Sequence, residues 1–124
     1  MIGVLALQGA FERHIEMLRS LGRTAVQVRT PAELAPCRGL IIPGGESTTL
    51  TILMEKYSLY DAIRAFAGTR PVMGTCAGAI MLSSRVDDAR VTPLGLMDIE
   101  TVRNAYGRQV ESFITLIDTP FTGD

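Results

Sequence analysis

A cysteine between two glycines is the feature of this sequence best suited to chemistry. Cys76 lies in Gly74-Thr-Cys-Ala-Gly78, after the apolar stretch Pro71–Met73 and before a helix-forming run that starts at Ala77. A strand, a tight turn and a helix in this order form the arrangement that presents a nucleophile above an α/β sheet. The glycines permit a strained turn, and the helix start favours a thiolate and can receive an oxyanion. This pattern predicts a nucleophile at Cys76, whereas the alternative is a buried structural cysteine.

A second strand-to-helix turn carries a double glycine. The stretch Leu40–Thr49 reads Leu-Ile-Ile-Pro-Gly-Gly-Glu-Ser-Thr-Thr, and Ser47 or Thr48 is expected to cap the following helix. The pair Gly44-Gly45 allows backbone N–H groups to face a ligand without a Cβ in the way. The turn is therefore either a capped structural connection or an oxyanion and substrate loop, and its expected position beside Cys76 favours the second.

Candidate acid–base and anion-binding residues are few. His14 is the only histidine, and it falls within the apolar stripe of an expected helix. A packed histidine is the better interpretation, although a reactive Cys76 thiol needs a base within reach. Arg103 and Arg108 lie in an expected loop, either as solvated charges or as guanidinium groups that clamp a carboxylate.

The elements that must position these residues alternate along the chain. Strands are expected at Ile2–Leu7, Thr24–Val28, Gly39–Ile42 and Pro71–Met73, helices at Ala10–Leu21, Ser47–Tyr57, Leu59–Phe66 and Ala77–Leu82, and a loop or short helical turn at Pro31–Cys37. This alternation predicts an α/β fold with a doubly wound, mostly parallel sheet and helices on both faces. Ligands bind at the carboxyl ends of such strands, so Gln8-Gly9, Gly44–Glu46 and Cys76 should converge on one edge.

The pattern changes after about Ser84. Ile99–Val102 and Val110–Ile117 read as strands that flank the polar loop Arg103–Gln109. Because no helical segment separates them, an antiparallel pair is expected. The length of 124 residues predicts one domain, covering residues 1–124.

Composition excludes several classes of partner. The net charge is −1 with no basic block, so neither nucleic acid nor a membrane is an expected partner. No apolar stretch approaches the ~20 residues of a membrane span. Two cysteines without a local spacing motif suggest reduced thiols and a cytoplasmic location. One histidine is too few for a histidine-based metal site, and we expect neither a metal nor a cofactor.

These segments together resemble the triad-type glutamine amidotransferases, and within them the glutaminase subunits of pyridoxal 5′-phosphate synthase. The resemblance rests on Leu5-Ala-Leu-Gln-Gly-Ala10 with His14, Ile42-Pro-Gly-Gly-Glu-Ser-Thr-Thr49, Gly74-Thr-Cys-Ala-Gly78, Arg103-Asn-Ala-Tyr-Gly-Arg-Gln109 with Ser112-Phe113, and Pro120-Phe-Thr-Gly123. The cysteine turn indicates only the superfamily. The Gly-Gly-Glu-Ser-Thr-Thr and Arg-Asn-x-Tyr-Gly-Arg-Gln pieces are more specific. The fold implied is the flavodoxin-like sheet of the class I glutamine amidotransferases.

The resemblance also implies roles. Cys76 would attack the side-chain amide of L-glutamine, giving a glutamyl thioester and ammonia. Gly45 and the amide of Ala77 would form the oxyanion hole, and Gly45, Glu46, Ser47 and Arg103 match positions that hold glutamine. The ammonia would pass to a synthase subunit that builds pyridoxal 5′-phosphate (vitamin B6), and hydrolysis would depend on docking to that partner. The segment from Gln8 to His14 matches a region near the docking surface.

One departure concerns the catalytic base. The family's base and its orienting carboxylate lie in a His-Pro-Glu stretch near the C-terminus, and these residues do not include it. His14 matches a non-catalytic position of the family. The resemblance therefore implies a domain truncated at its C-terminus, with the nucleophile and oxyanion half of a site, and we expect no glutaminase activity from this chain alone. Two alternatives stay open: a non-catalytic module that docks on the synthase, and a DJ-1-like cysteine enzyme.

Overall fold

A parallel sheet of four strands lies at the centre of the fold. In the computed structural model, which describes residues 1–103 and 116, the strands stand in the order β2-β1-β3-β4. They are β1 (Ile2–Leu5), β2 (Ala25–Val28), β3 (Gly39–Ile42) and β4 (Val72–Gly74). The helices are α1 (Phe11–Ser20), α2 (Pro31–Leu34), α3 (Ser47–Lys56), α4 (Leu59–Ala67) and α5 (Ala77–Leu82). The predicted α/β fold and parallel sheet are confirmed, and the ends of these elements other than α2 lie within two residues of those expected.

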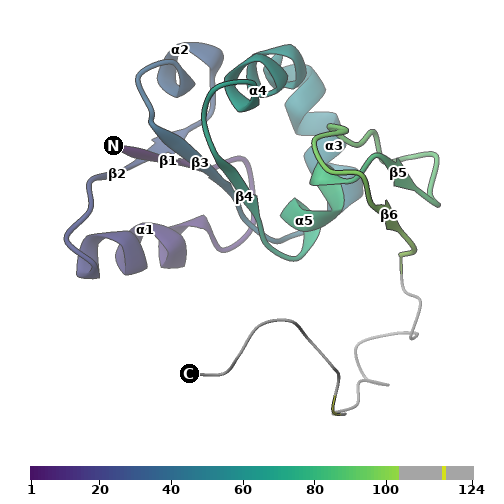
Figure 1. Cartoon of the computed structure of the whole chain (residues 1–124), viewed down its shortest axis with the longest axis horizontal. Coiled ribbons are helices and arrows are strands. Elements are labelled where there is room, and N and C mark those ends of the chain that lie inside the picture. The colour runs from purple at the N-terminus through teal and green to yellow at the C-terminus, as the bar shows by residue number, and fades with distance from the viewer. Residues whose placement is uncertain (104–115, 117–124) are drawn as a thin grey trace.

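Helices cover both faces of the sheet, but unequally. Figure 1 shows α1 on one side of the strands and α2 and α4 on the other. The larger core joins the sheet to α2, α3, α4 and α5, with Leu5, Ile42 and Met54 at its centre. The smaller core lies under α1, where Ile15 meets Val4 and Ala25. No helix in the described residues is long and apolar enough to cross a membrane.

The first helix ends where the sequence predicts. Gly22 has a φ of +75°, and its N–H bonds to the carbonyl of Arg19, while the N–H of Arg23 bonds to the carbonyl of Leu18. These two bonds form the glycine stop that satisfies the last free carbonyls of a helix. The helix was expected to include Leu21, but α1 ends at Ser20, and Leu21, the residue that follows it, is 67% exposed.

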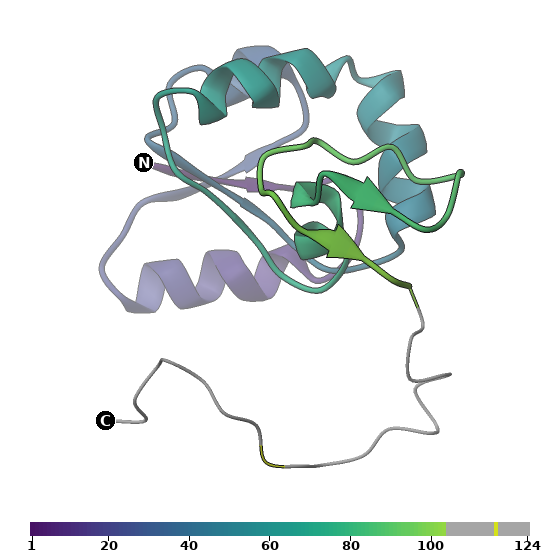
Figure 2. The same cartoon turned by 45° about the vertical axis from the view of Figure 1, so that its right-hand side comes forward.

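A small second sheet follows α5. β5 (Arg85–Val86) pairs in parallel with β6 (Glu100–Thr101), so the strand expected at Ile99–Val102 is present in shortened form. Its expected antiparallel partner, Val110–Ile117, lies almost entirely outside the described residues, as does Arg108. Figure 2 shows this pair beside α5, with the connection between its strands reaching toward α3.

Two side chains of α4 form hydrogen bonds to the connection between β5 and β6. The Tyr60 hydroxyl donates to the Thr92 carbonyl at 2.7 Å, and Arg64 Nε donates to the Leu94 carbonyl at 3.0 Å. Val91 and Leu94 are buried against the main core. These contacts hold the middle of the connection, which begins with Asp87 and Asp88.

Candidate active site

Three turns meet at the carboxyl edge of the central sheet. The Gln8 side-chain amide donates to the Glu46 carbonyl at 3.2 Å, which joins the turn after β1 to the turn after β3. A Cβ placed on Gly44 would lie 3.0 Å from the Cβ of Cys76 and 3.5 Å from its Sγ. The turn after β3 therefore passes directly against the thiol at the end of β4. This is the convergence that the strand order predicts.

The backbone of Cys76 has the strained shape expected of a nucleophile turn. Its φ is +53° and its ψ is −118°, a combination that costs a non-glycine residue of order 1–3 kcal/mol. The side chain is exposed, and Ala77 begins α5 directly after it. The structural alternative, a buried inert cysteine, is therefore wrong for Cys76.

The flanking glycines are required by close approaches of backbone to backbone. A Cβ on Gly78 would collide with the carbonyl oxygen of Ile42 at the end of β3, and one on Gly74 would collide with the carbonyl of Gly78. The turn thus closes on itself and on the neighbouring strand with no room for a side chain. This packing holds Cys76 in its unfavourable conformation.

The two thiols occupy opposite environments. Cys37 is 1% exposed, and its Sγ lies 3.5 Å from the carbonyl oxygen of Glu33. Burial raises the pKa of the Cys37 thiol, which disfavours the reactive thiolate. Neither cysteine forms a disulfide. Of the two, only Cys76 presents its thiol at the edge where the turns meet.

The double-glycine turn is open toward solvent at Gly45 and Glu46 and closed at Ser47. Gly45 has a φ of +142°, and a Cβ there would collide with the Gln8 side chain. The helix cap predicted at Ser47 or Thr48 was wrong: Glu46 occupies the cap position, and α3 already begins at Ser47. Ser47 is 2% exposed, and its Oγ has no hydrogen-bond partner among the described residues. An unsatisfied buried hydroxyl is costly, and a ligand at this turn would relieve it.

A charged cluster of Glu46, Asp88, Arg90 and Arg103 borders this turn. Arg103 Nη1 donates to Asp88 Oδ2, and Arg103 Nη2 lies 3.9 Å from Glu46 Oε2. Arg90 donates to the same Asp88 carboxylate from its side chain and its backbone. The Arg90 hydrogen bonds, with that from Arg103, hold the pKa of Asp88 well below its ordinary value. Asp88 is therefore ionised at neutral pH, and Arg103 reaches the edge of the site as a bound cation.

His14 lies nearer the site than its sequence position suggests. It is half-buried on α1, and its Nε2 lies 3.3 Å from the Thr75 hydroxyl, next to Cys76 in the chain. The expected packed histidine is consistent with this partial burial. Its contact with Thr75 is a long-range pairing across 61 residues that helical periodicity does not reveal.

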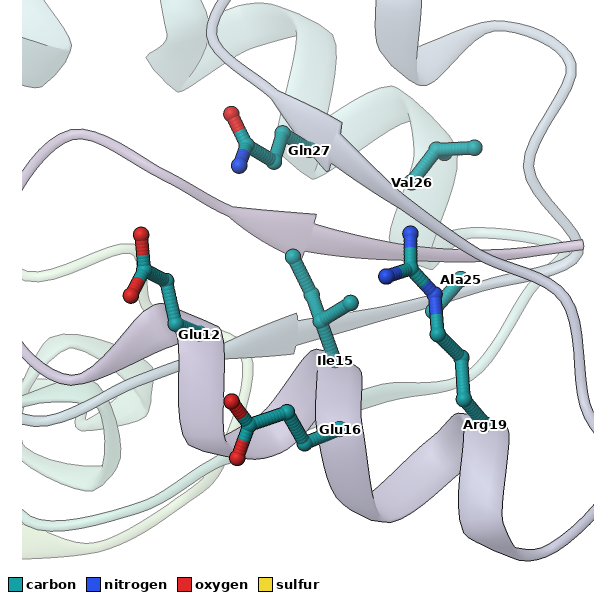
Figure 3. Close-up of a pocket in the computed structure, with 7 residues that line it drawn as sticks. All are labelled: Glu12, Ile15, Glu16, Arg19, Ala25, Val26 and Gln27. Atoms are coloured by element: carbon teal, nitrogen blue, oxygen red, sulfur yellow. The ribbon is translucent and has the colours of Figure 1, made fainter.

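An open groove elsewhere has no connection with this edge. Figure 3 shows it between α1 and β2, with Glu12, Glu16 and Arg19 projecting from the helix and Gln27 from the strand. Its volume is about 420 Å³. None of its lining residues belongs to the three turns, so its size does not make it the catalytic site.

Comparison with known proteins decides the family. Residues 4–121 match the SNO glutamine amidotransferase family. The chain belongs to this family. A glutamine amidotransferase of known crystal structure superimposes with a TM-score of 0.81 at 44% identity, covering 90% of this chain and 61% of that one. A putative peptidase E from Listeria monocytogenes EGD-e, at 16% identity and a TM-score of 0.63, shares the fold.

Two curated relatives share the same name. The chain is 49% identical over 124 residues to the pyridoxal 5′-phosphate synthase subunit PdxT of Desulforudis audaxviator, covering 99% of this chain and 66% of the relative. It is 50% identical over 123 residues to the PdxT of Brevibacillus brevis, covering 98% and 64%. The chain thus spans about two thirds of the length of these relatives.

The structure brings the predicted site residues close together. Two adjoining turns carry Gly45 with Glu46 and Cys76 with Ala77. Ser47 follows at the start of α3, and Arg103 reaches the same place from the residues after β6. Sequence reasoning missed Asp88 entirely. The sequence places the pair Asp87-Asp88 directly after a strand, but no local feature distinguishes this pair from the acidic residues of a solvated turn.

Proposed function

We propose that this chain is the nucleophile-bearing part of a glutaminase that releases ammonia from L-glutamine. The observation that carries the proposal is the exposed thiol of Cys76, held at a φ of +53° against the double-glycine turn. A strained backbone at a reactive side chain is characteristic of a catalytic position. Family membership supports the same conclusion, as does the Ser47 hydroxyl beside this turn, which has no hydrogen-bond partner in the described part of the chain.

The proposed chemistry is acyl transfer to sulfur. The thiolate of Cys76 attacks the amide carbon of the glutamine side chain, and the negative charge moves to the amide oxygen. Backbone N–H groups of Gly45 and Ala77 stabilise this oxyanion. The C–N bond then breaks, the nitrogen takes up a proton and leaves as ammonia, and water hydrolyses the γ-glutamyl thioester to glutamate. Proton transfer requires a base, which the family resemblance places in a His-Pro-Glu stretch nearer the C-terminus.

Substrate recognition falls to the turn after β3 and to Arg103. A guanidinium forms forked pairs with carboxylates, so Arg103 suits the α-carboxylate of glutamine. The Glu46 carboxylate suits the amino group of glutamine, and the Ser47 hydroxyl suits its other polar atoms. No cofactor is needed for this reaction.

The names of the relatives supply the proposed destination of the ammonia. They are synthase subunits, so we expect a pyridoxal 5′-phosphate synthase partner that consumes the ammonia. We also place the protein in the cytoplasm, where reduced thiols persist. Neither nucleic acid nor a membrane is part of the proposal.

The proposal is tested by ammonia release from a joined chain, defined as this chain followed by the C-terminal third of the Desulforudis audaxviator relative. Mixed with a synthase subunit, the joined chain should release ammonia from glutamine. Cys76→Ser should abolish release, and Cys37→Ser should leave it unchanged because Cys37 is buried away from the turns. The chain without the added third should release none.

The alternatives predict different results. A non-catalytic docking module would bind the synthase in the joined form yet release no ammonia. A DJ-1-like cysteine enzyme would neither bind the synthase nor act on glutamine. Ammonia release that survives Cys76→Ser would overturn the assignment of the nucleophile.

A further inference from the structure

Asp88 binds two arginines whose exposure differs. Arg90 holds it from the solvent side, with its own side chain 74% exposed. Arg103 holds it from within, and the side chains of Arg103 and Asp88 are only 15% and 19% exposed. The neighbouring Asp87 accepts the backbone N–H of Arg103 at 2.8 Å. The turn after β5 therefore fixes both the backbone and the guanidinium of Arg103.

Because the backbone and Nη1 of Arg103 are held, the position of the other terminal nitrogen, Nη2, is also set. Nη1 is used by Asp88, whereas Nη2 points toward Glu46 and stops 3.9 Å from its carboxylate. At that distance the two groups attract each other without a hydrogen bond. Arg103 thus reaches the edge of the double-glycine turn, and no hydrogen bond from its Nη2 is made to the described residues, which leaves this donor for a third group.

Loss of Asp88 would change this arrangement in a defined way. Among the described residues, Glu46 is the other carboxylate within 4 Å of the Arg103 guanidinium, and it stands on the turn beside Gly45 and Ser47. A released guanidinium would move closer to Glu46 and turn their 3.9 Å ion pair into a direct hydrogen-bonded pair. That pair would occupy the donors that a substrate carboxylate needs.

We propose that Asp88 is a positioning residue for substrate recognition, which holds the Arg103 guanidinium clear of Glu46 so that it can receive the α-carboxylate of an amino-acid substrate. This inference rests on the proposed function, because it assigns the substrate carboxylate to Arg103. It adds a residue that touches no substrate atom and acts through Arg103.

The test is covalent labelling of Cys76 in this chain by a diazoketone analogue of glutamine, followed by mass spectrometry. The labelling rate is measured against probe concentration, which separates the half-saturating concentration from the maximal rate. Asp88→Asn should raise the half-saturating concentration about tenfold, the size expected for loss of a charged hydrogen bond, with little change in the maximal rate. Asp88→Glu, which keeps the charge, should recover part of the loss.

Two comparisons separate recognition from folding. Iodoacetamide carries no α-carboxylate, so its rate of reaction with Cys76 should be the same in Asp88→Asn and the unmodified chain. Arg90→Gln removes the exposed partner of Asp88 and leaves Arg103 in place, so it should change half-saturation less than twofold. Arg103→Lys should raise half-saturation at least as much as Asp88→Asn.

The outcomes distinguish the inference from the proposed function. Normal half-saturation in Asp88→Asn, with a raised value in Arg103→Lys, would overturn the role of Asp88 and leave the glutaminase proposal intact. A parallel fall in the iodoacetamide rate would also overturn it, since the defect would lie in the Cys76 turn. Labelling of the unmodified chain that neither saturates nor is slowed by L-glutamine would overturn both.

Discussion

The two cysteines of this chain show how environment decides chemistry at the scale of one residue. Cys76 combines exposure with a strained backbone, and Cys37 combines burial with a raised thiol pKa. Thiolate fraction and access together control the rate of alkylation. The same side chain therefore differs in reactivity at the two positions.

We expect iodoacetamide to modify Cys76 at least tenfold faster than Cys37 in the folded chain. In denaturant, where both thiols are exposed, the two rates should become similar. Peptide mass spectrometry at timed intervals measures both. Equal rates in the folded protein would show that position 76 has no special reactivity.

Gly45 is expected to contribute to turnover beyond its part in the fold. Gly45→Ala should reduce the turnover of the joined chain about a hundredfold, because a displaced N–H no longer faces the oxyanion. Its φ of +142° adds backbone strain, which thermal unfolding will register. Gly22→Ala is the matched control, since Gly22 has a φ of +75° with open space around it and lies far from the turns. A comparable fall in turnover for both variants would assign Gly45 to structure alone.

At the scale of elements, the contact between α5 and β3 depends on the absence of one Cβ. A methyl group at Gly78 would overlap the carbonyl of Ile42, and neither backbone can move without disturbing the sheet. Gly78→Ala should therefore destabilise the chain by about 2–3 kcal/mol in urea unfolding. At Gly95 the positive φ is the strain that a side chain would meet, so Gly95→Ala should lower the free energy of unfolding by about 1 kcal/mol. If Gly78→Ala proves the milder of the two, the close approach does not exist in solution.

Elements were more predictable than the pairings between them. The strands, and the turns that follow β3 and β4, could be predicted from the sequence because buried parallel strands are continuous apolar runs that end at glycine. The cap at Ser47 failed because Glu46 already has the extended backbone of a cap residue, which moves the helix start by one position. The contact between Asp88 and Arg103 could not be predicted from the sequence, because it depends on the parallel pairing of two short strands that have no local signature. The site was therefore predictable where residues follow strands, and not where distant charges meet.

At the scale of the whole molecule, the described residues leave part of the sheet face on the α1 side uncovered. Beside α1, a hollow of about 220 Å³ is lined mainly by apolar side chains from β3, β4 and the helix, among them Leu18, Ile41 and Met73. Met73 is 56% exposed. We expect further protein to cover this apolar surface.

Met73→Gln should have opposite effects in the short and the joined chain. In this chain it should lower the binding of a hydrophobic dye and slow aggregation, with little loss of stability. In the joined chain, where added residues are expected to cover the hollow, it should cost about 1–2 kcal/mol of unfolding free energy. Dye fluorescence and urea unfolding measure the two effects, and an equal response in both chains would mean that the hollow stays open.

The left-handed backbone at position 76 also bears on what selection has favoured. Glycine would adopt a φ of +53° and a ψ of −118° without steric penalty, so Cys76→Gly should raise the unfolding free energy by about 1 kcal/mol while removing the thiol. A sequence shaped only for stability would place glycine there. Under the proposed function, cysteine at this position gives up folding stability for reactivity, a trade that is characteristic of active sites.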